Sequence, residues 1–285
     1  MGEPIPLSVW PTAQQTSRGQ RAGRYTPASI AHPAKMLPAI ARQAITAYTD
    51  PGDVVVDPMC GIGTTLVEAV HLQRRAVGVE YEPRWAALAR ANLRLAAAQG
   101  AAGTGAVHTG DGGRLPGLLP ADLQGRVALV LTSPPYGTSV HGHVTATPNH
   151  GVTKRNDRYT SRPQADGNLA HASDDRLLDA FTSILATARR VLRADAVVAI
   201  TTRPWRRRGV LVDFPAAVVA AAERAGLVLV ERNVALLAGL RGDRLVPRAS
   251  FFQLTHVRNA RTRGTPLRVI AHEDVLVFRS AQEQT

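Results

Sequence analysis

The residues with the clearest chemical potential are Leu131-Thr132-Ser133-Pro134-Pro135-Tyr136-Gly137, which follow the apolar run 127–130. A short apolar run closed by two prolines is typical of a buried strand that ends in a sharp turn. Because proline donates no hydrogen bond, the Ser133 oxygen and the Pro134 carbonyl can both accept from an outside N–H group, with Tyr136 as a stacking face. Ligands of open α/β sheets lie at such strand ends, so the turn predicts a site for a flat substrate that carries an amino group. An ordinary Pro-Pro turn is the alternative.

A second stretch, residues 53–65, combines a β-branched strand with a glycine loop and the start of a helix. Units of this kind open the nucleotide-binding α/β sheets. The loop lacks Gly-Lys-Ser/Thr, which excludes a P-loop, and Leu66 stands where the dinucleotide fingerprint needs its third glycine. Asp57 at the strand end would repel a pyrophosphate but could meet a cation. The loop therefore favours S-adenosylmethionine, which carries an ammonium and a sulfonium group.

Acids also end the next two predicted strands. Glu80 closes the strand 76–80, about 20 residues past the glycines, where a carboxylate can hold both ribose hydroxyls. Tyr81 could then pack on the adenine. Asp111 follows the strand 106–110 and can accept a hydrogen bond from the adenine amino group. Each acid could instead be a helix cap or a turn residue, but fitting groups at four consecutive strand ends argue against coincidence.

Composition limits the class of protein. The 285 residues are 45% hydrophobic and 20% charged, as in ordinary globular proteins, and they contain neither a long apolar run nor a signal-peptide core. We therefore expect a cytoplasmic protein without a membrane partner. The single cysteine, Cys60, excludes an internal disulfide. His141-Gly142-His143 has no further ligands nearby, so we expect no metal.

The net charge is +12, and all but two of the 34 basic residues are arginine. Arginine binds phosphate through its planar fork, so this excess would concentrate a polyanion at the surface. A coding bias toward Arg and Ala would give the same composition. Charge alone therefore does not establish a nucleic-acid partner.

The chain is expected to form one domain over residues 32–285 behind a flexible arm. Residues 1–31 are rich in Pro, Gln, Ser, Thr and Gly and are expected to stay disordered until something binds. Residues 137–173 lack apolar periodicity and are either a substrate-recognition insert or a solvated one. Periodicity predicts further helices over 39–45, 66–70, 84–98, 176–192 and 211–225, and further strands over 196–202, 227–235 and 274–279.

Basic residues follow two of these predicted elements. The candidates for contact with nucleic acid are Lys154, Arg155 and Arg158 in the insert, and Arg203, Arg206, Arg207 and Arg208 around Trp205. Arginines between 241 and 268 form a second basic region. A solvated charge run is the alternative for each group.

Four segments together resemble the amino-methyltransferases of DNA, in the N4-cytosine and N6-adenine group. These are His32-Pro33-Ala34-Lys35, Asp57-Pro58-Met59-Cys60-Gly61-Ile62-Gly63-Thr64-Thr65, Val79-Glu80 and Thr132-Ser133-Pro134-Pro135-Tyr136. A weaker similarity lies at residues 272–278. The resemblance implies an α/β protein with a Rossmann-like methyltransferase fold, whose seven-stranded, mostly parallel sheet ends in an antiparallel strand.

The resemblance also implies roles for these residues. His32 and Lys35 would lie near the methionine end of S-adenosylmethionine, and Glu80 would hold its ribose. The target amine would be held by Ser133, Pro134, Pro135 and Tyr136 after the base has flipped out of a duplex. The loop that wraps the cofactor would use Asp57, Pro58, Met59, Cys60, Gly61, Gly63, Thr64 and Thr65.

The target of such an enzyme has several candidates. Serine before Pro-Pro is commoner among N4-cytosine enzymes, which makes N4 of cytosine in DNA the first candidate and N6 of adenine the second. Met59-Cys60 also resembles guanine-N2 methyltransferases of RNA, although an arm of 31 residues is too short for their upstream RNA-binding domain. A protein glutamine amide and a non-catalytic binding role are further alternatives. A restriction endonuclease is a candidate partner.

Overall fold

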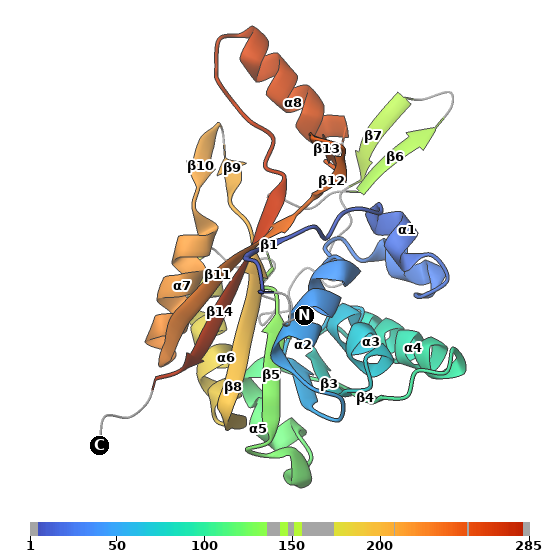
Figure 1. The fold of residues 1–285 in the computed structure, drawn as a ribbon, viewed down its shortest axis with the longest axis vertical. Helices are drawn as coiled ribbons and strands as arrows, with labels where there is room; N and C mark the ends of the chain where they lie inside the picture. Colours follow the sequence, from blue (N-terminus) through green and yellow to red (C-terminus); the bar gives the residue numbers. More distant parts are fainter. Residues whose placement is uncertain are drawn as a thin grey trace.

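An eight-stranded sheet forms the centre of the protein (Figure 1). The structure is a computed structural model, and it describes residues 5–135, 143–147, 151–155, 174–207, 209–249 and 251–281. The strand order is β1-β11-β14-β8-β5-β2-β3-β4. The strands are β1 (Val9–Trp10), β2 (Val54–Asp57), β3 (Arg75–Glu80), β4 (Thr104–Thr109), β5 (Val127–Thr132), β8 (Leu192–Thr202), β11 (Leu227–Leu236) and β14 (His272–Ser280).

The α/β fold class and the direction of the last strand are confirmed. Strands β4, β3, β2, β5 and β8 are parallel neighbours, and β14 pairs antiparallel with both β8 and β11. The sheet has eight strands instead of seven because β1 adds to its edge, parallel to β11. Each strand of the parallel set therefore ends at the same edge, which we call the carboxyl edge.

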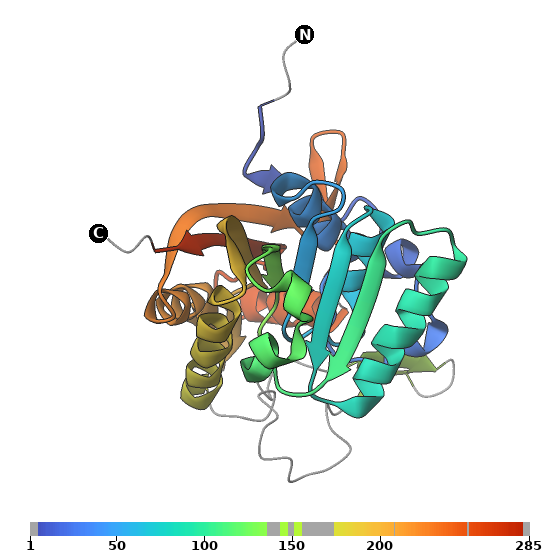
Figure 2. The same ribbon diagram turned by 90° about the horizontal axis from the view of Figure 1, so that it is seen from below.

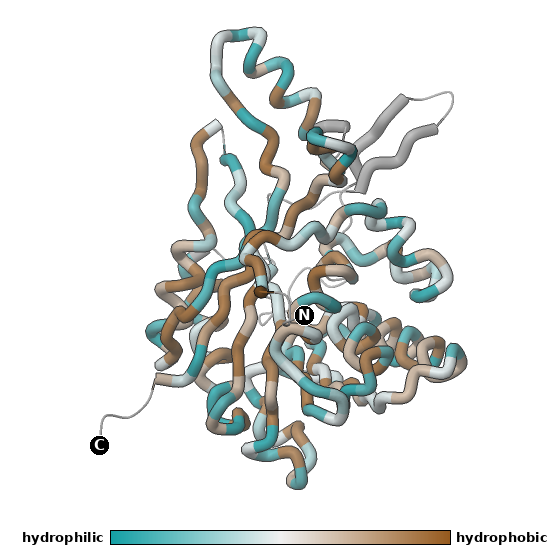
Figure 3. The backbone as a smooth tube through the Cα atoms, in the orientation of Figure 1, coloured by the Kyte–Doolittle hydropathy of each residue, from teal (hydrophilic) through white to brown (hydrophobic). Residues whose placement is uncertain are grey.

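Helices cover both faces of the sheet (Figure 2). One hydrophobic cluster packs α2 (Pro38–Tyr48), α3 (Thr64–His71) and α4 (Pro83–Ala98) on one face, and a second packs α6 (Asp174–Arg189) and α7 (Phe214–Arg224) on the other. All of β2 is buried because both of its faces are covered, which explains its continuous β-branched run. In Figure 3 much of the central strands has the brown colour of hydrophobic residues.

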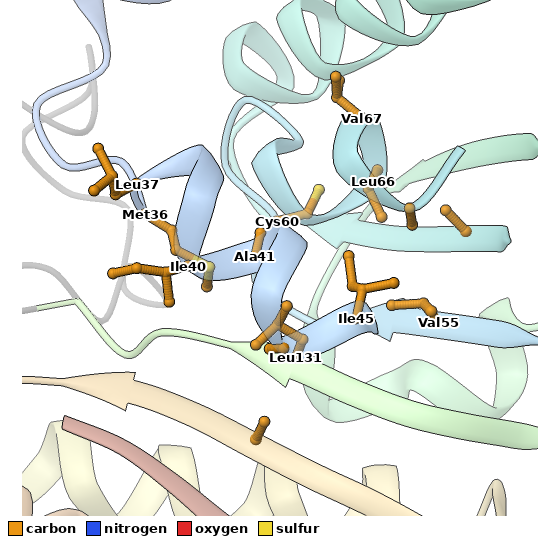
Figure 4. Packing of buried hydrophobic residues seen from close by; sticks show 14 of the residues in the cluster. Met36, Leu37, Ile40, Ala41, Ile45, Val55, Cys60, Leu66, Val67 and Leu131 are labelled. Atoms are coloured by element: carbon orange, nitrogen blue, oxygen red, sulfur yellow. The ribbon is translucent and has the colours of Figure 1, made fainter. Parts of the chain in front are cut away.

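Helix α2 fixes the position of the segment before the glycine loop. Its Ile40 and Ile45 are fully buried and belong to one cluster with Val55 of β2 and Leu131 of β5 (Figure 4). The preceding Met36 is also buried in this cluster. The apolar face of α2 therefore holds the residues from His32 onward against the ends of the two central strands.

The arm is folded, and the prediction that residues 1–31 are flexible is wrong from residue 5 onward. It forms β1, the short helix α1 (Ser17–Arg21) and the 3₁₀ turn η1 (Pro27–Ala31). Trp10 and Tyr25 are buried in the main cluster. The composition of the arm suggested disorder, but its polar residues have fixed partners on the body of the protein.

The strongest of these partners is Glu68 of α3, whose side chain is completely buried. Arg24 donates to both of its oxygens at 2.8 Å, and the Tyr25 hydroxyl donates at 2.8 Å. Arg42 adds a contact at 3.3 Å from α2. A buried carboxylate is costly without such partners, so these contacts hold the arm on α3.

Several short elements were not predicted from the sequence. Three hairpins were missed because strands of three to five residues carry little periodicity, and one helix was missed as well. Helix α7 begins at Phe214, later than predicted, because residues 210–212 form a strand. Within the described residues, no helix is both long and apolar enough to cross a membrane. The missed elements are β6 (His143–Thr147) with β7 (Gly151–Arg155), β9 (Trp205–Arg207) with β10 (Val210–Val212), β12 (Ala238–Arg241) with β13 (Arg244–Pro247), and α8 (Phe251–Thr262).

The Glu68 contacts predict how the arm can be released. Glu68→Gln should lower the free energy of unfolding by about 2–4 kcal/mol, because it leaves Arg24 without its carboxylate. It should also expose the arm to trypsin at Arg21 and Arg24. Denaturant unfolding and limited proteolysis measure the two effects. Glu223→Gln on the exposed face of α7 is the control and should change neither; equal protease resistance in both variants would contradict the role of Glu68.

Candidate active site

The predicted site residues at the strand ends come together on the carboxyl edge. Asp57 ends β2, Glu80 ends β3 and Asp111 follows β4, and these strands are direct neighbours in the sheet. Ser133 follows β5 on the other side of β2. The four positions that the sequence singled out therefore form one continuous row.

The glycine loop closes tightly between β2 and α3. Gly61 and Gly63 have φ angles of +54° and +79°, a region that favours glycine. The Cys60 N–H donates to the Val79 carbonyl at 2.9 Å. A Cβ on Gly61 would lie 3.1 Å from Nε2 of His32. The loop and the His32 segment, both predicted to hold the cofactor, are thus in direct contact.

His32 is itself held from the other side. Its ring is buried and lies edge-on to Trp85 of α4, with centroids 4.7 Å apart. Lys35 turns back on its own segment and donates to the carbonyls of Ile30 and His32. The His32 segment and the glycine loop, both predicted to hold the cofactor, are therefore packed tightly against each other.

Glu80 holds the glycine loop and keeps capacity for a ligand. Its two oxygens accept from the Gly61 N–H and the Glu82 N–H, each at 2.8 Å. A carboxylate has about four lone-pair positions, so each oxygen can accept one more donor, as a ribose diol requires. Burial raises the pKa of Glu80 to about 7, against the opposing effect of the two backbone donors. Tyr81 beside it is 43% exposed and available to a ligand.

Asp57 has a different arrangement from the one expected. It accepts from Thr65 at 2.8 Å, from Thr132 at 2.8 Å and from the Met59 N–H at 3.1 Å. Burial raises the pKa of Asp57 to about 6, while these three donors lower it. These donors make Asp57 a link between the glycine loop, α3 and the end of β5. Its contact with a cation stays a prediction.

Asp111 both caps a turn and keeps an oxygen for a ligand, which are the two roles that its sequence position allowed. It is exposed, and its Oδ1 accepts from the Gly113 N–H at 2.8 Å, which caps the short 3₁₀ turn η2 (Gly112–Arg114). Its other oxygen has no protein donor among the described residues and can accept from a ligand. A Cβ on Gly112 would lie 2.4 Å from the Pro58 carbonyl, so this turn packs directly on the glycine loop.

The predicted catalytic turn leaves β5 at the carboxyl edge. Thr132 is the last residue of the strand, Ser133 and Pro135 are partly exposed, and Pro134 is buried. Tyr136 lies outside the described residues. On the next strand Ile200 pairs with Thr132, so Thr201 stands beside the turn, and its buried hydroxyl has no partner within the described part of the chain.

Two residues that hold the loop were not predicted. Arg21 of the arm donates to the Thr64 hydroxyl at 3.3 Å and to the Met36 carbonyl. Asn92 of α4, fully buried, donates to the Ile62 carbonyl at 2.9 Å and accepts from the Thr26 N–H at 2.9 Å. A polar residue on the apolar side of an Ala-rich helix was the available signal for Asn92. No local signal pointed to Arg21.

The predicted nucleic-acid residues are only partly assembled. Trp205 is buried against Phe214, with ring centroids 4.6 Å apart, so it anchors the β9-β10 hairpin instead of offering a stacking face. Arg203 is partly buried near Glu273. Arg206 donates to the Gly209 carbonyl at 3.4 Å, and Arg207 is exposed. Arg158 and Arg208 lie outside the described residues, as do the side chains of Lys154 and Arg155 in β7.

Glu273 is a further acid at this edge that the sequence did not single out as a site residue. Burial raises its pKa, and the charge of Arg203 opposes that rise. It lies at the start of β14, where Asp274 pairs with Thr202. The carboxyl edge therefore carries polar groups beyond β5, across β8 and β14.

Comparison with known proteins agrees with this geometry. Residues 3–91 match the N6_N4_Mtase family model, described as DNA methylase. The match includes the arm, the His32 segment, the glycine loop and Glu80, and it ends before Ser133. The fold is a Rossmann-like methyltransferase fold.

A solved structure shares this fold at low sequence identity. TrmN from Thermus thermophilus is 17% identical, with a TM-score of 0.51; the match covers 92% of this chain and 53% of that one, so the chain spans about half the length of TrmN. A SAM-dependent O-methyltransferase from Thermotoga maritima is 10% identical, with a TM-score of 0.48, over 88% of this chain and 68% of that one.

S-adenosylmethionine is the cofactor that the family match and the fold imply, and the residues present fit it. Gly61 and Gly63 offer backbone without side chains, Glu80 has acceptor capacity for two hydroxyls, and Tyr81 offers an exposed ring. Asp111 adds an acceptor at the next strand end. The bound cofactor would supply an electrophilic methyl group on sulfur.

The raised pKa of Glu80 predicts that cofactor binding depends on pH. Ribose hydroxyls favour the ionised carboxylate, so binding releases a proton, and affinity should rise as pH increases through about 7. Between pH 6 and 8 the gain should be about tenfold, since the ionised fraction rises from about a tenth to about nine tenths. Calorimetry across this range measures it. Glu80→Gln should bind more weakly with a flat profile, and a variant profile as steep as the wild type would assign the proton to another group.

The contact between Gly61 and His32 predicts a second effect. Gly61→Ala should weaken S-adenosylmethionine binding at least tenfold, because the added methyl group pushes the His32 ring out of its position. Gly52→Ala is a matched control: its φ of +89° is equally unfavourable for alanine, but the methyl group would meet nothing within 4 Å. Both variants should lose about 1 kcal/mol of stability. Equal cofactor affinity in the two would contradict a binding role for the His32 contact.

Proposed function

We propose that this protein transfers a methyl group from S-adenosylmethionine to an exocyclic amino group of a DNA base, with N4 of cytosine as the first candidate. The observation that carries the proposal is the pair of hydrogen bonds from Thr132 and Thr65 to Asp57, each 2.8 Å. They join the Ser133-Pro134 turn to the glycine loop across adjacent strands. The DNA methylase match over residues 3–91 supports DNA as the substrate.

The chemistry depends on orienting a weak nucleophile. The lone pair of an exocyclic amine is conjugated into the ring, so the amine attacks poorly unless its N–H groups are held. The Ser133 oxygen and the Pro134 carbonyl can accept both N–H groups and aim the nitrogen at the methyl carbon. With S-adenosylmethionine bound, the amine nitrogen would bond to the methyl carbon as the methyl–sulfur bond breaks, which would release S-adenosylhomocysteine. The amine proton would then leave to water, because serine is too weak a base to take it first. Positioning supplies most of the rate gain.

Access to the amine in a duplex requires base flipping, for which Tyr136 is the proposed stacking residue. The proposed phosphate contacts are Arg203, Arg206, Arg207, Arg208, Lys154, Arg155 and Arg158. A restriction endonuclease as partner and a cytoplasmic location belong to the same proposal. Adenine N6 is the alternative base, and guanine N2 of RNA is the alternative substrate.

Cys60 supports methylation of an amine over methylation of carbon 5. Carbon-5 methylation of cytosine needs a thiolate that attacks carbon 6. Burial, together with the nearby Asp57 and Glu80 carboxylates, raises the pKa of Cys60 well above its usual range. Its thiol is packed inside the glycine loop, 3.9 Å from the Gly61 carbonyl. A thiol in this setting is a poor nucleophile, which favours an amino target.

The test is transfer of labelled methyl groups to DNA, to RNA and to protein, followed by digestion of the product to nucleosides. We expect N4-methylcytosine in DNA. N6-methyladenine would keep the mechanism and change the base, whereas label only in RNA or protein would overturn the substrate assignment. Finding 5-methylcytosine would overturn the chemistry.

Single variants separate the catalytic turn from the rest. Ser133→Ala should reduce the rate by roughly tenfold to a hundredfold with cofactor affinity unchanged, because one acceptor of the amine is lost. Ser183→Ala, on the exposed face of α6, is the control and should retain full activity. Cys60→Ser should also remain active. A dead Cys60→Ser variant that still binds cofactor would contradict the proposed mechanism.

The β9-β10 arginines give a prediction for binding. Replacing Arg206, Arg207 and Arg208 with Ala should flatten the salt dependence of DNA binding by up to roughly three units of slope. Titrations of a labelled duplex at several salt concentrations measure this. An unaltered slope would show that the phosphate contacts lie on another surface.

A further inference from the structure

The unit formed by β12, β13 and α8 is the most basic part of the chain outside the site described above. Residues 238–268 contain a single acid, Asp243, and seven arginines: Arg241, Arg244, Arg248, Arg258, Arg261, Arg263 and Arg268. Six of the seven are exposed, with Arg248 the exception. Among the described residues none of these arginines has a carboxylate partner, so their charge is not neutralised within the protein.

The chain path brings this unit to the carboxyl edge. It leaves the sheet at the end of β11 and returns at the start of β14, and these two points lie at the same edge as Ser133. Figure 1 shows α8 projecting outward from the sheet beyond this edge. A large ligand bound to α8 would therefore extend over the Ser133-Pro134 turn.

Helix α8 divides into a packed side and a polar side. Ala260 is buried, and Leu254 and Val257 are partly covered. The opposite side exposes Arg258, Asn259 and Thr262, which recur at helical spacing. Arginine and asparagine are the side chains that recognise guanine and adenine edges in the major groove of DNA, which accommodates a helix of this kind. The deep, narrow major groove of A-form RNA does not.

The base of the unit is fixed, although α8 projects. Arg248 donates to the Ala13 carbonyl at 3.3 Å and to the Gln14 carbonyl at 3.0 Å. The Leu240 N–H donates to the Gln14 side chain at 3.3 Å. The same arm reaches the glycine loop through Arg21 and Thr64. The unit is thus held at a set position relative to the cofactor loop.

We propose that β12, β13 and α8 form a docking surface for duplex DNA, with α8 in the major groove and its arginines on phosphates and base edges. The proposal rests on the proposed function and adds the surface that holds the duplex while a base enters the site. It assigns the larger contribution to DNA binding to residues 238–268 and the smaller one to the β9-β10 arginines.

The experiment compares two triple variants that lose equal charge. In the first, which we call the α8 variant, alanine replaces Arg258 and Arg261 of α8 and Arg263 just after its end. In the control, alanine replaces Arg126, Arg190 and Arg279. The control residues are equally exposed and lie at the opposite edge of the sheet. Binding of a fluorescent duplex is measured by anisotropy at several salt concentrations, and cofactor binding is measured by calorimetry.

We expect the α8 variant to bind duplex DNA at least tenfold more weakly, with a salt slope smaller by roughly two to three units. The control should change affinity less than twofold, and both variants should bind S-adenosylmethionine normally. An unchanged slope in the α8 variant, an equal loss in both variants, or a loss confined to duplex RNA would overturn the proposal.

Methyl transfer by the wild type separates this outcome from the proposed function. If the wild type methylates DNA but the α8 variant binds DNA normally, the docking surface is wrong and the function stands. If the α8 variant loses DNA binding but the wild type transfers no methyl group to DNA, the docking surface stands and the function is wrong.

Discussion

The carboxylate of Asp57 is the interaction on which the site depends. It accepts from the first turn of α3, from the end of β5 and from the backbone of the glycine loop. The loop-helix unit 57–65 and the end of β5, two separate parts of the chain, therefore share one buried group. Burial of that group is costly, and three donors offset the cost. The Asp57 carboxylate therefore fixes the position of the glycine loop relative to the turn that carries Ser133.

The glycine loop is held from its other side by the arm and by α4. Arg21 reaches the Thr64 hydroxyl, and Asn92 holds the Ile62 carbonyl. The arm is in turn anchored by Arg24 and Tyr25 on the buried Glu68. These polar contacts add to the burial of Cys60 and Ile62 in the hydrophobic cluster. A loop without such supports would lose its shape, since glycine gives the backbone wide conformational freedom.

The two edges of the sheet have different characters. The central strands β2 and β5 are buried along their whole length between two helical layers. At the carboxyl edge they end in polar groups, and the chain extends there into the β9-β10 hairpin and the unit of β12, β13 and α8. The rigid centre therefore supports a polar, strongly basic margin. Such a division suits an enzyme that must align a small cofactor and a large polyanion at one place.

Local signals in the sequence determined the central sheet and the row of strand-end residues. β-Branched runs, the glycine loop and the Pro-Pro turn each lie within a few neighbouring residues, and the register of a parallel sheet then brings Asp57, Glu80 and Ser133 together. The antiparallel β14 came from family resemblance, because no local pattern encodes strand direction.

Only the tertiary structure decided what those residues do and which others join them. Asp57 accepts a hydrogen bond from Thr132, 75 residues away, which the sequence did not predict. The arm looked disordered because its composition is polar, yet Glu68 and Asn92 give its polar groups fixed partners. Trp205 lies among the arginines predicted to contact nucleic acid, but its ring packs on Phe214. The contacts of Asp57 and of the arm join distant segments, and the Trp205 contact depends on how the β9-β10 hairpin packs on α7. Composition and periodicity carry no information about such contacts.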